Sequence, residues 1–341
     1  MDTFITPKNN DLSNHQELAL RWLLRSCQAN QGGGSSAFYA RWRNWRKGWS
    51  DPYPETTGYL IPTLFAYQAR FPALEPAEAA RSCYRWLLSL AQPTGAFTSL
   101  YASSGQPSLF NTGQILLGLT AGYQDQPSPA AEVIINRSID WCLKAIADSP
   151  KNIPGLYFPG FLAAYYIRAV WPLALAMQVM GRSEEWNQLH PISELLAERI
   201  QPDGALVEAG FKPGSAAFLH TIAYTIRGWW ELGCLWEDPK TQNRGLQILE
   251  HYWRRRNIAG RWAGAYLTPG KDQLQFTCLP GQAQIAILLQ KIGKAKGIDG
   301  YQVEAHRLIK ELCAHQKKGW NRLKRHWCLG SSPFFDARII P

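Results

Sequence analysis

Several motifs that identify an enzyme class directly are missing from this sequence. It has no phosphate-binding P-loop, no dinucleotide-binding glycine fingerprint and no His-Glu-x-x-His zinc motif. The Gly-x-Ser-x-Gly elbow of serine hydrolases is also absent. Nucleotide-dependent transfer and serine hydrolysis are therefore disfavoured, and the sequence predicts neither a cofactor nor a bound metal.

The cysteines and the apolar runs indicate neither disulfides nor a membrane span. Seven cysteines are scattered without a Cys-x-x-Cys pair, so no disulfide framework or zinc site is indicated. Most lie in apolar contexts and are expected to be small core residues. No apolar run reaches about 18 residues, and the first residues, 1–14, are polar. We expect no membrane span, no leader and a cytoplasmic location.

Acidic residues are few relative to basic ones, at 26 against 36, which gives a formal net charge of +10. Basic residues cluster at 41–47, 254–256 and 317–325. Any one cluster alone is typical of a solvated surface, but the total charge favours an acidic partner. No helix-turn-helix, zinc-finger or RNA-binding signature accompanies it, so nucleic acid is disfavoured. The predicted partner is an acidic saccharide or a lipid-linked sugar.

Apolar and aromatic residues are abundant. Hydrophobic residues make up 46% of the 341 residues and charged residues only 18%, which permits a large core. The 15 Trp, 14 Tyr and 13 Phe exceed what packing needs, and such rings commonly stack on sugars or apolar ligands. No linker or change in composition divides the chain. We predict one domain spanning residues 1–341.

A repeat of about 55 residues organises the chain. Arg21-Trp-Leu-Leu returns as Arg85-Trp-Leu-Leu and, more loosely, as Asp140-Trp-Cys-Leu. Each of these segments precedes a glycine- and aromatic-containing loop and then a more apolar segment. In the apolar segments, Gly58 and Gly113 are 55 residues apart, and Gly281 follows Gly113 by 168 residues, or three steps of 56. The pattern indicates stacked helical hairpins.

Two kinds of helix, one apolar all round and one amphipathic, are typical of two concentric layers. We therefore predict an all-α protein, an α/α toroid of about six helical hairpins, with an open solenoid as the alternative. A sixth outer helix is expected near 302–316, but the next repeat step lands at Asp336. The sixth inner helix is thus predicted to be incomplete. The resulting gap is expected to stay open, to be plugged by the tail, or to be filled by a second copy in a homodimer.

In such a toroid, the starts of the inner helices line one mouth, where free N–H groups converge. Glu55 stands at the first of these starts, within 51–64, and is the only acid at the matched positions. It is interpreted either as a helix-start carboxylate or as a catalytic one. His220, Tyr224 and Arg227 are spaced four and three apart, so they share one helical face. The predicted catalytic residues are Glu55, Asn111, His220, Tyr224 and Arg227.

The remaining polar and aromatic residues that the repeat and its loops place at this mouth are predicted to bind substrate. They are Tyr53, Tyr59, Gln114, Tyr166, Arg168, Glu208, Tyr266, Asp272 and Gln282.

Two reaction types fit these residues. Proton abstraction next to a uronate carboxylate, leading to elimination or epimerisation, needs a charge neutraliser, a base and an acid. Asn111 or Arg227 would neutralise, while His220 and Tyr224 would handle protons. The alternative is glycoside hydrolysis by two carboxylates, with Glu55 paired to Glu208 or Asp272.

The junction motifs also carry a family resemblance. Tyr53-Pro-Glu-Thr-Thr-Gly-Tyr59, Phe110-Asn-Thr-Gly-Gln114, the segment 220–233 and Cys278-Leu-Pro-Gly-Gln-Ala-Gln284 resemble a family of bacterial toroids. Its members carry prenyltransferase/squalene-oxidase repeats and are terpenoid-cyclase-like. Many are encoded in exopolysaccharide biosynthesis clusters, so the resemblance implies the same toroid and a role in that process. Toroidal polysaccharide lyases, which use Asn, His, Tyr and Arg in one cleft, offer a chemical analogy.

This sequence departs from that family in two respects. The segment 330–336 replaces the family's Trp-rich ending, and neither the Asp-x-Asp-Asp nor the Asp-Asp-x-x-Asp motif of isoprenoid enzymes is present. An isoprenoid-processing enzyme and a non-catalytic binding component of polysaccharide synthesis remain as further alternatives.

Overall fold

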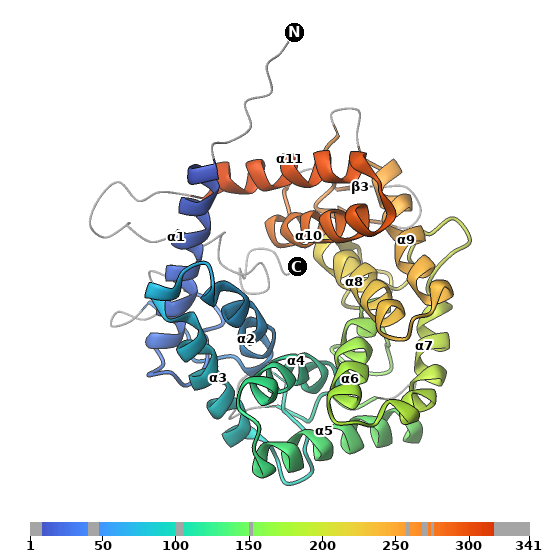
Figure 1. Cartoon of the computed structure of the whole chain (residues 1–341). Helices are drawn as coiled ribbons and strands as arrows, with labels where there is room; N and C mark the ends of the chain where they lie inside the picture. The colour runs from blue at the N-terminus through green and yellow to red at the C-terminus, as the bar shows by residue number, and fades with distance from the viewer. Residues whose placement is uncertain are drawn as a thin grey trace.

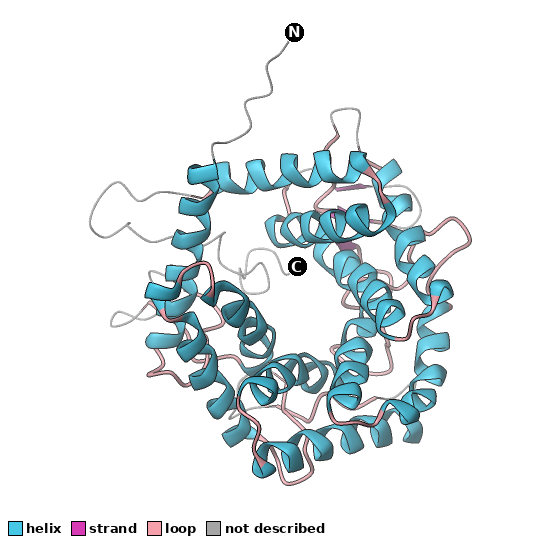
Figure 2. Cartoon of the chain, in the orientation of Figure 1, coloured by secondary structure: helices cyan, strands magenta, loops and turns pink. Residues whose placement is uncertain are grey.

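The described part of the chain is almost entirely helical. A computed structural model describes residues 9–39, 48–99, 105–149, 153–256, 260–267, 272–273 and 276–316 (Figure 1). Within these ranges it contains eleven α-helices, short 3₁₀ turns and three two-residue strands (Figure 2). The predicted all-α class is therefore confirmed. None of the described helices is both long and apolar enough to cross a membrane.

The helices form two concentric layers (Figure 1). The inner helices are α2 (Pro54–Gln68), α4 (Leu109–Asp125), α6 (Ile167–Val179), α8 (Leu219–Leu235) and α10 (Leu279–Lys296). The outer helices are α1 (Asn9–Gln28), α3 (Pro76–Leu90), α5 (Pro129–Asp148), α7 (His190–Ala197), α9 (Pro239–Arg254) and α11 (Asp299–His315). Consecutive inner helices pack side by side from α2 to α10. The predicted α/α toroid is confirmed.

Burial follows the distinction between the two layers that the sequence predicts. In inner helix α4 every residue from Asn111 to Thr120 is buried, so the helix is enclosed on all sides. In outer helix α9 the buried positions, including Thr241, Gly245 and Ile248, recur every three or four residues. Such spacing leaves the other face of α9 in water.

The repeated glycine is explained by close packing between inner helices. A Cβ atom on Gly58 of α2 would lie 2.6 Å from the Cα atom of Ile115 in α4. A Cβ atom on Gly113 would lie 2.8 Å from the Cβ atom of Ala169 in α6. Only glycine permits these approaches, so the repeat marks the places where neighbouring inner helices touch.

The first and last described outer helices meet and close the ring (Figure 1). The Nδ1 atom of His15 in α1 is hydrogen-bonded to the Gln316 side chain, whose Nε2 atom also donates to the His15 carbonyl at 3.1 Å. This closure is inconsistent with an open solenoid. The predicted incomplete sixth inner helix falls on residues 317–341, which lie outside the described residues.

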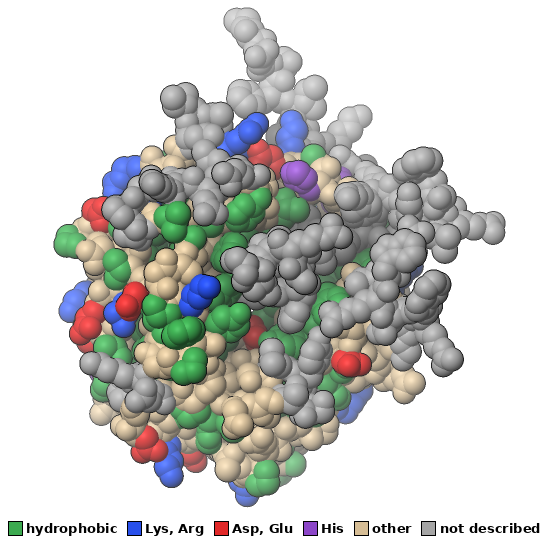
Figure 3. Space-filling model, turned by 180° about the vertical axis from the view of Figure 1, so that it is seen from behind, with side chains coloured by type: hydrophobic (Ala, Val, Ile, Leu, Met, Phe, Trp, Pro, Cys, Tyr) green, Lys and Arg blue, Asp and Glu red, His purple; other side chains and the backbone are tan. Residues whose placement is uncertain are grey.

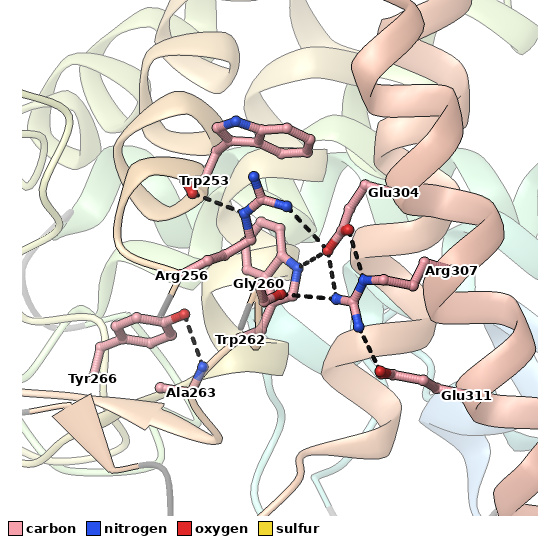
Figure 4. A network of polar contacts seen from close by, with 9 residues as sticks. All are labelled: Trp253, Arg256, Gly260, Trp262, Ala263, Tyr266, Glu304, Arg307 and Glu311. Carbon is pink, nitrogen blue, oxygen red and sulfur yellow. Dashed lines mark hydrogen bonds and ion pairs between the residues drawn. The ribbon is translucent and has the colours of Figure 1, made fainter. Parts of the chain in front are cut away.

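A polar network ties the loop after α9 to outer helix α11 (Figure 4). The buried carboxylate of Glu304 accepts hydrogen bonds from Trp262 at 2.8 Å and from Arg307 at 2.7 Å. Arg256 lies 3.3 Å from the same carboxylate oxygen. Because this loop leads into α10, the network helps to fix the start of the last described inner helix.

A small antiparallel sheet joins two of the long loops before inner helices. Strands β1 (Ala217–Phe218), β2 (Ala265–Tyr266) and β3 (Asp272–Gln273) pair in the order β1-β2-β3. Ala217 is opposite Tyr266, and Ala265 is opposite Gln273. The sheet therefore links the entrance of α8 to the loop that precedes α10.

Candidate active site

The starts of the inner helices bring most of the predicted polar residues together. Glu55, Asn111 and Arg168 lie in the first turns of α2, α4 and α6, and His220 lies in the first turn of α8. Figure 3 views the molecule from the side opposite to Figure 1. Hydrophobic side chains gather around the middle of that face, whereas most charged side chains lie toward its edge.

Glu55 is the acidic residue of this cluster. Its Oε2 atom accepts hydrogen bonds from the Tyr53 hydroxyl at 3.3 Å and from Asn111 Nδ2 at 3.4 Å. Burial raises the pKa of the carboxyl group to about 7, and the Tyr53 hydrogen bond and the positive charge of Arg168 oppose the rise. Desolvation therefore prevails, and the carboxyl is much harder to ionise than an exposed glutamate.

The contacts of Glu55 bear on its two interpretations. In the described part of the chain Glu55 accepts no hydrogen bond from a backbone N–H group, but an acid in the first turn also interacts favourably with the helix dipole. The preceding Tyr53 and Pro54 instead set the chain into the helix without a side-chain cap. Glu55 is therefore not a hydrogen-bonding cap of α2, and its place in the first turn fits both interpretations.

Arg168 lies within the same cluster and is almost completely buried, with 4% of its surface exposed. Its carbonyl accepts a hydrogen bond from Gln114 Nε2 at 2.7 Å, which fixes the start of α6 against α4. The guanidinium Cζ atom lies 4.7 Å from the ring centre of Trp171 and 5.4 Å from that of Tyr224. Gln114 thus positions Arg168, and the two rings hold its cation.

Two tyrosines lie next to this cation. Burial raises the pKa of Tyr224 to about 12, and the charge of Glu55 adds to the rise. The pKa of Tyr59 is also raised, mainly by burial and then by Tyr224 and Glu55. Both phenols are therefore protonated at neutral pH and able to donate a proton.

The face predicted from the spacing of His220, Tyr224 and Arg227 is present in α8. The rings of His220 and Tyr224 meet edge to face with their centres 5.8 Å apart. Burial lowers the pKa of His220 to about 4, so its imidazole is neutral at pH 7. Arg227 follows one turn later, with its Cζ atom 5.2 Å from the centre of the Trp171 ring and its Nε atom 3.4 Å from Glu231.

The structure gives two predicted binding residues clear local roles in the loops. The hydroxyl of Tyr166 accepts a hydrogen bond from the Tyr157 backbone N–H at 3.2 Å. Tyr266 is a buried residue, and its hydroxyl accepts a hydrogen bond from the Ala263 backbone N–H at 3.1 Å. In both cases the phenol holds the shape of a loop beside an inner helix.

The other predicted binding residues lie in different surroundings. Glu208 forms an ion pair with Arg199 at 2.5 Å and is 39% exposed. In the described part of the chain no hydrogen bond or ion pair joins it to Glu55. Asp272 belongs to β3, and its side chain lies outside what the structure describes. Gln282 is buried in the first turn of α10, and its Oε1 atom has no partner among the described residues.

Sequence reasoning missed the aromatic residues that support the cluster. Trp171 lies beneath both guanidinium groups, and Phe110 packs against Tyr165 at 5.5 Å and Tyr166 at 5.4 Å between ring centres. The position of Trp171, three residues after Arg168 on one helix, is a signal that could have identified it. Phe110 precedes Asn111 and carries no comparable signal.

The cluster combines one carboxyl that titrates near neutrality, a neutral imidazole, two protonated phenols and two guanidinium groups. Such a set can remove a proton, supply another and bind an anion. Among the described residues no group of three or more His, Cys, Asp and Glu side chains could hold a metal ion.

Comparison with known proteins relates the chain to others through its fold. No protein family and no curated protein matches the sequence. Among solved structures, an unsaturated glucuronyl hydrolase specific for heparin is similar, with a TM-score of 0.66 at 12% identity over 90% of this chain and 85% of that one. A sugar epimerase from a ruminal bacterium gives 0.61 at 11% identity, covering 93% and 89%.

A third similar structure is an alpha-amylase from Clostridium perfringens, with a TM-score of 0.64 at 12% identity over 93% of this chain and 90% of that one. At such identities these likenesses establish the shared toroid fold, and function has to be inferred from the site.

Proposed function

We propose that the protein is an enzyme that acts on an acidic sugar by removing the proton beside the sugar's carboxylate, with Glu55 as the base. The observation that carries this proposal is the Glu55 carboxyl, whose pKa burial raises to about 7 while Tyr53 and Asn111 hydrogen-bond one of its oxygens. A base with a pKa near the working pH is both ionised in part and strong enough to accept a proton.

The reaction can proceed to elimination or to epimerisation. In elimination, the C5 proton of a uronate moves to Glu55, a double bond forms between C4 and C5, and the C4–O bond breaks. The leaving oxygen takes a proton from Tyr224, which burial keeps protonated. In epimerisation no bond to oxygen breaks, and C5 regains a proton on its opposite face.

The other residues of the cluster have supporting roles in this proposal. Asn111 would hold the base, and Arg227 would contribute positive charge toward the developing enolate. His220, neutral because burial lowers its pKa to about 4, would orient Tyr224 and would not carry charge. Gln114 would act through Arg168 and is a positioning residue.

The substrate class is supported by the net charge and by the kinds of enzyme that share the fold. The net charge of +10 favours a polyanion, and three similar folds belong to enzymes whose names refer to sugars or to amylase activity. We propose a uronate-containing polysaccharide or its lipid-linked precursor in exopolysaccharide synthesis. The polar cluster around Glu55 disfavours an isoprenoid substrate.

The test is incubation with a panel of uronate polymers and oligosaccharides. A new absorbance at the ultraviolet edge reports the double bond of elimination, and deuterium uptake from heavy water reports epimerisation. Glu55→Gln is expected to abolish either signal. Glu208→Gln, in which the altered carboxylate is paired with Arg199, is expected to retain it. If no polymer in the panel gives either the absorbance or the deuterium uptake, the proposal is overturned.

Glycoside hydrolysis is a second candidate because a carboxyl with a pKa near 7 also suits a general acid. Its second carboxylate would be Glu208 or Asp272. Hydrolysis would release new reducing ends. Loss of this release in Glu55→Gln, together with its loss in either Glu208→Gln or Asp272→Asn, would favour hydrolysis over proton abstraction, provided that His220→Ala keeps the activity. Binding of saccharides without any chemical change would instead identify a binding component.

A further inference from the structure

The most unusual charged group in the described part of the molecule is the buried guanidinium of Arg168. The residue is 4% exposed, and its Nε and Nη1 atoms have no hydrogen-bond partner among the described residues. Buried charges are normally paired, because transfer of an unpaired cation out of water is very costly. A cation held in this way needs an anion that the described residues do not supply.

Neighbouring charges increase this need. Arg227 lies over the same Trp171 ring as Arg168, with both guanidinium Cζ atoms within 5.2 Å of the ring centre. The carboxylate of Glu231 pairs with Arg227 and is also hydrogen-bonded to Lys291. It already has two cationic partners. No ion pair of Arg168 is present among the described residues.

Glu55 does not neutralise Arg168 fully. Burial raises the pKa of its carboxyl to about 7, although the charge of Arg168 favours the ionised form. Burial, followed by repulsion from Arg227, lowers the pKa of Arg168 to about 9, which leaves the guanidinium charged at pH 7. The centre of the mouth therefore carries excess positive charge beside Glu55, whose carboxyl has a raised pKa.

Aromatic side chains surround Arg168, and among the described residues no carboxylate forms an ion pair with it. Tyr59 and Tyr224 lie close enough to influence its pKa, and each has a hydroxyl that could contact the same ligand. Trp171 and Tyr224 present ring faces to the guanidinium, which fixes its plane without using its N–H donors. The buried Nε and Nη1 donors are unpaired among the described residues, and a guanidinium with unpaired donors can form planar, charge-assisted hydrogen bonds.

We infer that Arg168, flanked by Arg227, forms the subsite that binds the carboxylate of the acidic sugar and so determines specificity for a uronate over a neutral sugar. This inference rests on the proposed function. It places the substrate's carboxylate next to Glu55, so that the carbon bearing that carboxylate faces the base. The same cation would stabilise the enolate that forms when the proton leaves.

Binding can be tested separately from catalysis in the Glu55→Gln background. Glucuronate, glucose and glucose 6-phosphate are titrated by calorimetry into Glu55→Gln and into Glu55→Gln/Arg168→Gln. We expect glucuronate to bind the first protein and to lose at least tenfold in affinity in the second, as for loss of a charge-assisted hydrogen bond. Glucose is expected to bind weakly and equally to both.

Arg244→Gln in the same background is the matched control. Arg244 also stacks on a tryptophan, with its Cζ atom 4.8 Å from the Trp229 ring centre, but it is paired with Glu194 at 2.9 Å. Its replacement should leave glucuronate affinity unchanged. Thermal unfolding provides a second readout: glucuronate should raise the Tm of Glu55→Gln and of the Arg244 variant, but not that of the Arg168 variant.

Three results would overturn the inference. They are equal glucuronate affinity with and without Arg168, tighter binding of glucose 6-phosphate than of glucuronate, and no glucuronate binding while Arg168 is intact. Failure of the proposed function looks different. If glucuronate binds through Arg168 but no uronate polymer is changed by the wild-type protein, the carboxylate subsite stands and the proposed reaction is wrong.

Discussion

At the residue scale, the burial that tunes the candidate base also destabilises the fold. The pKa of Glu55 is about 7 in the folded protein against an ordinary value of 4.5, so the folded state binds its proton more tightly. Stability then falls as pH rises from about 4.5 to 7 and stays lower above that range. The difference corresponds to about 3 kcal/mol of lost stability at alkaline pH.

Glu55→Gln is therefore expected to be more stable than the wild type at pH 8, by up to about 3 kcal/mol, because no buried charge has to form. Below pH 4.5 the advantage should disappear, since the wild-type carboxyl is protonated in both states. Urea unfolding at pH 4.5 and pH 8 measures the difference. Glu208→Gln should show no gain in stability at pH 8, because the Glu208 carboxylate that it removes is ion-paired with Arg199. A Glu55→Gln gain that is independent of pH would show that ionisation of the buried carboxyl is not its cause.

His220 shows the opposite dependence. Burial lowers its pKa from 6.5 to about 4, so its contribution is fully present above pH 6.5 and is lost as pH falls toward 4. His220→Phe, a replacement that suits the surrounding Phe211 and Phe218 rings, should lose less stability than the wild type between pH 6.5 and 4.5. The expected difference over that interval is about 2 kcal/mol.

Unfolding free energies of His220→Phe and the wild type at these two pH values test this expectation. His306→Gln, which changes an exposed histidine on α11, serves as the control and should follow the wild type. Parallel loss of stability in His220→Phe and the wild type would show that acid destabilisation has another source.

At the element scale, the repeated glycines control how closely the inner helices pack. Gly113→Ala places a Cβ atom 2.8 Å from the Cβ and the carbonyl oxygen of Ala169, so α4 and α6 must move apart. We expect a loss of about 1–3 kcal/mol, as for other overpacked cores. Circular dichroism with urea denaturation measures it.

Gly300→Ala is the matched control for that substitution. Gly300 lies in α11 without any heavy atom within 4 Å of a built Cβ, so the substitution should stabilise the protein by about 0.5–1 kcal/mol through helix propensity. If both variants were stabilised, close approach at Gly113 would not limit the packing of α4 against α6.

The elements also show how far the sequence predicts this site. Residues carried by inner helices were predicted correctly as neighbours, because a 3.6-residue period places Tyr224 beside His220 and the repeat places Asn111 beside Glu55. Neither the period nor the repeat places the loop residues. Tyr266 folds back on Ala263, and Glu208 pairs with Arg199, through contacts that depend on tertiary structure.

At the scale of the whole molecule, ring closure could be predicted only in outline. The repeat indicates a curved array, but contact between His15 and Gln316, which are separated by 301 positions, depends on the small rotation added at every hairpin. No local pattern encodes that sum. The sequence therefore predicts the two layers, and the described structure supplies the closed ring and the side chains that converge within it.

The net charge of +10 adds a property that no single residue accounts for. Exposed charges attract a polyanion over about one Debye length, which shrinks from about 30 Å at 0.01 M salt to about 10 Å at 0.1 M. A long uronate polymer should therefore bind Glu55→Gln at least tenfold more weakly at 0.3 M than at 0.01 M salt. Binding of glucuronate, which is proposed to contact the buried Arg168, should weaken much less, because buried charges are screened less.

Fluorescence anisotropy with labelled polymer and calorimetry with glucuronate measure the two dependences on salt. Equal salt dependence for polymer and monosaccharide would mean that both bind the outer surface, and polymer binding that ignores salt would mean that the overall charge has no part in recognition.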